Sequence, residues 1–150
     1  MKDYTIRPMK TKDQEIIMQN LTQNNLPTED LTEEKLRNFF VAENAKGLIL
    51  GCVGIEIKKE AGLLRSLYID SPYRGQGIGK RLVKELEAIS AVKGVAELYL
   101  LTTTAEGLFR ELSYKKIDRE AVPDFIKETE EFRTLCPGSA ACMYKKIAAR

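Results

Sequence analysis

The segment Arg74-Gly75-Gln76-Gly77-Ile78-Gly79-Lys80 places three glycines between two basic residues. Glycine has no Cβ, so such a segment can turn sharply and direct several backbone N–H groups at one point. The residues after it are predicted to form a helix, whose first turn adds unpaired N–H donors and partial positive charge. The segment therefore predicts an anion site suited to a pyrophosphate, although a plain turn and helix cap would also explain the glycines.

Two nucleotide-binding motifs do not fit this segment. A P-loop requires Gly-Lys-Ser/Thr after four intervening residues, and the segment lacks that ending. A dinucleotide-binding fold places its glycines after the first strand of a βαβ unit. Here the glycines follow the fourth predicted strand.

Hydrophobic periodicity predicts the elements that must position this loop. Period-2 patterns and buried apolar runs predict strands over 4–7, 40–43, 48–58, 63–69, 95–101, 115–118 and 139–147. Helical spacing and capping residues predict helices beginning near 11–13 and at 32, and further helices over 78–92, 105–112 and 123–135. The order β-α-α-β-β-β-α-β-α-β-α-β predicts an α/β (α+β) chain with a mixed sheet and a central antiparallel hairpin.

Composition fits one globular domain over residues 1–150, with 43% apolar residues, 31% charged residues and a formal net charge of +2. Basic and acidic residues are interleaved, so no nucleic-acid partner is expected. No apolar run reaches the roughly 18 residues that would span a bilayer, so no membrane partner is expected. The N-terminal residues lack the apolar core of a signal peptide, which predicts a cytoplasmic chain.

The chain contains no histidine. This absence excludes Ser-His-Asp hydrolysis and cysteine–histidine nucleophiles, and it removes a common zinc ligand, so no metal is expected. The three cysteines, Cys52, Cys136 and Cys142, are an odd number without close pairing, which is typical of a reducing compartment. Any chemistry must use carboxylates, hydroxyls, thiols, the backbone or water.

The glycine loop and its surroundings resemble a known family. Arg74-x-x-Gly77-x-Gly79 is similar to the R/Q-x-x-G-x-G/A signature of the GNAT superfamily of N-acyltransferases, and the resemblance extends to Leu67-x-Ile69 and Pro72-Tyr73 before it. The order of elements also fits across essentially the whole chain. The resemblance implies a single domain with a mixed, mostly antiparallel sheet of six to seven strands and helices on both faces. It also implies a bulge in strand 4 and a V-shaped split between strands 4 and 5.

The resemblance further implies acetyl-CoA as the co-substrate. Backbone N–H groups from Arg74 to Lys80 would hold the pyrophosphate, and Leu67, Tyr68 and Ile69 would pair with the pantetheine arm. The N–H groups of Tyr68 and Ile69 would steady the developing oxyanion. The predicted CoA contacts are therefore Leu67, Tyr68, Ile69, Arg74, Gly75, Gln76, Gly77, Ile78, Gly79, Lys80 and Phe109.

Acetylation of an amine requires proton transfer but no enzyme nucleophile. Phe109 occupies the position at which many GNAT members carry a tyrosine that protonates the leaving thiolate, so the proton donor is left open. Glu56 is a candidate base, with a solvated strand position as its alternative. Thr102, Thr103 and Thr104 could hydrogen-bond the acceptor or a relay water, or simply cap the next helix. Tyr114 is expected to pack in the core.

A narrower resemblance concerns the acceptor. Residues 101–109 are similar to acetyltransferase domains of N-acetylglutamate synthases, and 26–31 with 131–143 are similar to arsenic-resistance-associated N-acetyltransferases. This implies a small, amino-acid-like acceptor, contacted by Leu26, Thr102 and Thr103. Arg65 and Arg133 are candidates for binding its carboxylate through a bidentate guanidinium, or each is a surface charge or part of an ion pair at the rim.

Other functions are left open. The acceptor could be a polyamine, an antibiotic or a protein amine, and the acids of Glu29-Asp30 and Glu33-Glu34 would suit a polyamine unless they only begin a helix. The replacement at Phe109 also leaves open a GNAT module that binds acyl-CoA without turnover. A thiol or arsenic role for Cys136 and Cys142 has buried, inert cysteines as its alternative. A homodimer is compatible with the family resemblance.

Overall fold

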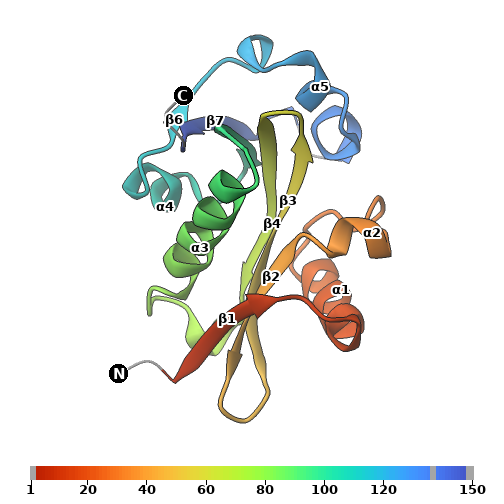
Figure 1. The fold of residues 1–150 in the computed structure, drawn as a ribbon, viewed down its shortest axis with the longest axis vertical. Helices are drawn as coiled ribbons and strands as arrows, with labels where there is room; N and C mark the ends of the chain where they lie inside the picture. The colour runs from red at the N-terminus through yellow and green to blue at the C-terminus, as the bar shows by residue number, and fades with distance from the viewer. Residues whose placement is uncertain (1–2, 136–137, 148–150) are drawn as a thin grey trace. The chain divides into compact units, whose positions relative to one another are not determined.

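The computed structural model describes residues 3–135 and 138–147 (Figure 1). Over these residues a seven-stranded sheet has the hydrogen-bonded order β1-β2-β3-β4-β5-β7-β6. The strands are β1 (Tyr4–Pro8), β2 (Phe39–Asn44), β3 (Ile49–Lys58), β4 (Ala61–Ile69), β5 (Glu97–Thr102), β6 (Lys115–Lys116) and β7 (Ala141–Lys146). β4 pairs with β5 in parallel, whereas β1–β2, β2–β3, β5–β7 and β6–β7 are antiparallel. The predicted mixed, mostly antiparallel sheet is therefore confirmed.

The chain forms two compact units, of which the first comprises residues 1–55 and 66–86. It contains β1, β2, most of β3, the second half of β4 and the first part of a helix, α3 (Ile78–Val92). Its other helices are η1 (Thr11–Asp13), α1 (Gln14–Gln23), α2 (Glu33–Leu36) and η2 (Ser71–Tyr73). Thr32 caps α2 as predicted, because its hydroxyl accepts a hydrogen bond from the Lys35 amide.

The core of the first unit lies between the helices α1 and α2 and strands β2 to β4. Ile17 and Leu21 of α1 pack with buried apolar side chains of the other elements, which are Leu36, Phe39, Val41, Ile49, Cys52 and Tyr68. Ile16, the neighbour of Ile17 in α1, is 40% exposed. Asp13 occupies the N-cap of α1 without a side-chain cap. Its carboxylate instead accepts hydrogen bonds from Arg7 and the Lys10 amide, which tie β1 to the start of α1.

The second unit comprises residues 56–65 and 87–150. It contains the first half of β4, the strands β5 to β7 and the helices α4 (Glu106–Glu111), η3 (Arg119–Ala121), α5 (Asp124–Lys127) and η4 (Glu131–Leu135). Its core joins α5 and η4 to one face of β4, β5 and β7 through Ala61, Leu63, Tyr99, Val122, Ile126, Phe132 and Cys142. α3 ends as predicted, since Gly94 has φ of +95° and Val95 N donates to Ser90 O.

The segment 123–135 differs most from its prediction. The single helix expected there is divided into α5 and the π-helix η4. Thr129 lies between them, and its hydroxyl donates to the Ile126 carbonyl and accepts from the Phe132 amide. A threonine hydroxyl that bonds to nearby backbone competes with regular helix formation, which accounts for the break.

Candidate functional site

The glycine loop follows β4 through a short, capped turn. Asp70 N donates to Leu50 O at 2.8 Å, which fixes the end of β4 beside β3. The Asp70 carboxylate then accepts a hydrogen bond from Ser71 N and caps η2, in which Pro72 occupies the first turn. The chain therefore reaches the loop from a fixed position. α3, a helix of 15 residues, begins at Ile78, whose side chain is buried.

Gly75 and Gly77 give the loop its shape. Their φ angles are +80° and +85°, a region that residues with a side chain rarely adopt. A Cβ built on either glycine would meet no heavy atom within 4 Å, so the space beside the loop is open. The loop residues are exposed, whereas Ile78 anchors the helix. An open glycine turn that leads into the first turn of a long helix is an arrangement that binds phosphate groups.

The side chain of Arg74 is exposed, yet it forms hydrogen bonds with the protein. Its Nε donates to Ile69 O at 2.8 Å, and its Nη2 donates to Asn24 Oδ1 at 3.2 Å. These contacts connect the start of the loop to the end of β4 and to the residue after α1. The positive charge of Arg74 therefore stays beside the loop, and its side chain also stabilises the turn.

Ser66 interrupts the regular backbone of β4. It has φ of +62° although it is not glycine, and its carbonyl accepts a hydrogen bond from Cys52 Sγ. The parallel pairs of β4 with β5 run from Ala61–Glu97 to Leu64–Leu100, whereas β4 itself continues to Ile69. A left-handed residue two positions beyond the last pair agrees with the bulge that is predicted in this strand.

Tyr68 is predicted to act through its backbone N–H, whereas its side chain has a separate structural role. The ring packs in the core of the first unit, and the hydroxyl donates to Asp70 Oδ1 at 2.8 Å. Burial and then this hydrogen bond raise the pKa of Tyr68 to about 12. The phenol therefore stays protonated at neutral pH and braces the turn before the glycine loop.

In the second unit, two predicted residues with separate roles form one ion pair. Glu56 of β3, a candidate base, and Arg65 of β4, a candidate for binding the acceptor, are joined by an Arg65 Nη1–Glu56 Oε2 contact of 2.5 Å. Glu131 of η4, which the sequence did not single out, lies 3.2 Å from Arg65 Nε. The exposed fractions of the three side chains are 0% for Arg65, 8% for Glu56 and 3% for Glu131. The solvated alternative for Glu56 and the surface-charge alternative for Arg65 are therefore wrong.

Phe109 and Tyr114 form an edge-to-face aromatic pair, with ring centroids 5.3 Å apart. Both are buried, and the Tyr114 hydroxyl donates to Glu87 Oε2 at 2.8 Å. Burial, followed by the charge of Glu87 and this hydrogen bond, raises the pKa of Tyr114 strongly. The prediction that Tyr114 packs in the core is confirmed, and its hydroxyl serves this internal contact.

The remaining predicted residues occupy different surroundings. Thr102 Oγ1 accepts a hydrogen bond from Ala105 N at 2.9 Å, so this threonine caps the turn before α4, while Thr103 is exposed. Leu26 is partly buried against the first core. Arg133 is exposed on η4, in the same helix as Glu131. Their proposed contacts with an acceptor stay predictions.

The cysteines that the structure describes are suited to packing rather than to chemistry. Cys52 and Cys142 are free and buried. Burial raises the pKa of Cys52 to about 12 and also raises that of Cys142, which disfavours the reactive thiolate. Cys136 lies outside the described residues. Within residues 3–135 and 138–147, no group of three or more His, Cys, Asp or Glu side chains is arranged to hold a metal ion.

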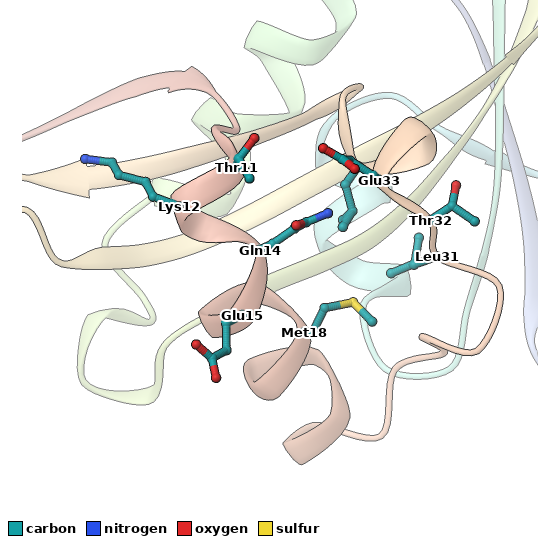
Figure 2. Close-up of a pocket in the computed structure, with 9 residues that line it drawn as sticks. Thr11, Lys12, Gln14, Glu15, Met18, Leu31, Thr32 and Glu33 are labelled. Atoms are coloured by element: carbon teal, nitrogen blue, oxygen red, sulfur yellow. The ribbon is translucent and has the colours of Figure 1, made fainter.

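A separate groove of about 540 Å³ lies in the first unit between the start of α1 and the start of α2 (Figure 2). It is lined by Thr11, Lys12, Gln14, Glu15, Met18, Leu31, Thr32, Glu33 and Leu36, of which Glu33 is one of the acids considered for a polyamine. Of the neighbouring acids, Asp30 is buried and paired with Lys35 at 2.8 Å. Asp30 therefore serves the local fold.

Comparison with known proteins identifies the family. The model of the acetyltransferase (GNAT) domain matches residues 35–116, which include β2 to β5, the glycine loop and α4. An uncharacterized N-acetyltransferase of Chlorobaculum tepidum is 36% identical over 110 residues, which are 73% of this chain and 68% of that protein. The chain therefore belongs to the GNAT acetyltransferases, which are acyl-CoA-dependent transferases.

Within the described residues, no helix has the length and apolar character that crossing a membrane requires.

The chain also resembles longer proteins and a protein of about its own length. An amino-acid acetyltransferase of Pseudomonas putida is 29% identical over 96 residues, which are 63% of this chain but only 22% of that protein. The fold matches N-acetylglutamate synthase from Neisseria gonorrhoeae, complexed with coenzyme A and L-arginine, with a TM-score of 0.83 at 16% identity, over 99% of this chain and 34% of that one. It also matches Rv2747 from Mycobacterium tuberculosis, in complex with CoA, with a TM-score of 0.82 at 20% identity, over 96% of this chain and 99% of that one.

Proposed function

We propose that this protein transfers the acetyl group of acetyl-CoA to the amino group of a small, amino-acid-like acceptor. The observation that supports CoA binding is the open turn at Gly75 and Gly77, which leads directly into α3. Its backbone N–H groups and the helix N-terminus would bind the pyrophosphate. β4 from Leu67 to Ile69 would pair with the pantetheine arm.

The reaction needs no covalent enzyme intermediate. The neutral amine attacks the thioester carbonyl carbon, the C–S bond breaks, and the proton lost by the amine balances the proton gained by the thiolate. The N–H groups of Tyr68 and Ile69 would stabilise the negative charge that develops on the carbonyl oxygen. Glu56 is proposed as the proton acceptor, with Thr103 as a hydrogen-bonding partner of the acceptor or of a relay water.

The amino-acid acceptor is supported by two observations. Amino-acid acetyltransferases occur among the relatives, at 28–29% identity over part of their length. The chain also carries Arg65 and Arg133, whose guanidinium groups suit a carboxylate. A polyamine is less favoured, because Asp30, one of the acids that would bind it, is paired with Lys35.

A screen of amines tests this proposal. The purified chain is incubated with acetyl-CoA and each of the twenty standard amino acids, spermidine, or a lysine-containing peptide, and the free thiol of CoA is followed with a chromogenic reagent. We expect turnover with at least one amino acid and little with spermidine or the peptide. Turnover with spermidine alone would contradict the acceptor class, and binding of acetyl-CoA without turnover of any amine would indicate a non-catalytic module.

A further inference from the structure

Arg65 lies between two carboxylates that come from different elements. Glu56 contacts Nη1 from β3, and Glu131 contacts Nε from η4, so the two acids occupy different sides of the guanidinium. The cluster holds two negative charges and one positive charge, and all three side chains are at least nine-tenths buried. One guanidinium charge therefore stabilises two carboxylates that water reaches poorly.

The two contacts differ in length and in how their residues are held. Glu56 lies 2.5 Å from Arg65 and belongs to a long strand inside the sheet. Glu131 lies 3.2 Å away and belongs to a five-residue π-helix outside the sheet. π-helical turns are rare and occur frequently at functional sites. Of the two contacts with Arg65, the one to Glu131 is longer and comes from outside the sheet, so it is the contact that we expect a second carboxylate to replace.

We propose that Glu131 occupies the side of Arg65 that the acceptor's carboxylate takes, so that acceptor binding exchanges one carboxylate for another. This inference rests on the proposed function, and it adds the requirement that the acceptor carries a carboxylate. Arg65 is 0% exposed, so the acceptor reaches it only when Glu131 withdraws. Because Arg133 belongs to the same π-helix, withdrawal also moves the second arginine that is predicted to contact the acceptor.

Replacing Glu131 with glutamine tests the exchange. The variant removes the competing charge while Glu56 still pairs with Arg65, and a thermal melt verifies that the variant is folded. In the wild type, only the fraction of protein in which Glu131 has left Arg65 can bind the acceptor, and this lowers the apparent affinity. The variant removes that competition, so we expect its KM for the amino acid to be lower by on the order of tenfold. The KM for acetyl-CoA should not change. Glu128→Gln, an exposed position between α5 and η4, is the matched control and should leave both constants unchanged.

A second substrate separates exchange from a structural role. The α-carboxamide of the best amino acid lacks the carboxylate that Arg65 would bind, so its KM should lie well above that of the amino acid in both the wild type and Glu131→Gln. An unchanged or raised KM for the amino acid in Glu131→Gln would overturn the inference while the proposed function stands. If the wild type acetylates no amino acid, the proposed function and this inference both fall. Glu131→Asp, which keeps the charge, should retain a KM within about threefold of the wild type.

Discussion

Replacing Gly77 with glutamate is expected to raise the Kd for CoA by at least about a hundredfold, or roughly 2.7 kcal/mol. The space beside Gly77 is open in the structure, and the proposed occupant is the pyrophosphate. A glutamate side chain would enter that space and place a negative charge against the phosphates. Isothermal titration calorimetry with CoA measures the change in affinity, and a thermal melt verifies that the variant is folded.

Gly77→Ala separates the added charge from backbone strain. Alanine would have to adopt the same φ of +85°, so it carries the same conformational cost with only a methyl group. We expect it to lose less than about tenfold in CoA affinity, in keeping with strain on the order of 1 kcal/mol. Equal losses in both variants would assign the effect to loop conformation. A glutamate variant that binds CoA as tightly as the wild type would exclude the loop as the pyrophosphate site.

Replacing Arg65 with methionine is expected to destabilise the protein by about 3–5 kcal/mol. The change leaves Glu56 and Glu131 as two buried carboxylates without their shared cation. For a chain of this length, that loss lowers the melting temperature by roughly 10 °C or more. Chemical denaturation monitored by circular dichroism gives the free energy of unfolding directly.

A triple variant provides the control for this prediction. Glu56→Gln and Glu131→Gln added to Arg65→Met remove all three charges, and neutral replacement of a buried ionic cluster is often neutral or stabilising. We therefore expect the triple variant to recover most of the stability that the single variant loses. If Arg65→Met alone were as stable as the wild type, the buried ion pairs would not contribute to the fold.

Most of the fold could be predicted from the sequence, because its signals are local. Alternating apolar residues define β3, and apolar residues at helical spacing define α3, in which Ile78, Leu82, Val83 and Leu86 are all buried. The break in 123–135 could not be predicted, since it depends on which backbone groups the Thr129 hydroxyl reaches. Hydrophobic spacing alone predicts a continuous helix over these residues. The hydrogen bonds of the Thr129 side chain account for the break between α5 and η4.

The candidate site also has a part that could be predicted from the sequence and a part that could not. The glycine loop is contiguous in sequence, so its position after β4 and before α3 could be predicted from spacing. The charges of the acceptor half are distant in sequence, and only the folded chain brings Glu56, Arg65 and Glu131 together. From the sequence, Glu56 and Arg65 therefore have separate roles and Glu131 is missed. The position of Arg65 within the apolar strand 63–69 indicates a charged partner but does not say which one.

The most direct test of the central claim compares acetyl-CoA with S-acetylpantetheine, which carries the thioester but no pyrophosphate. At about 100 times its Kd, acetyl-CoA should stabilise the fold by about 2.7 kcal/mol, which raises the melting temperature by roughly 5–10 °C. S-acetylpantetheine at the same concentration should give little shift, because it has no group for the loop from Arg74 to Lys80. No shift with millimolar acetyl-CoA, or equal shifts with both compounds, would contradict the assignment of this loop to CoA.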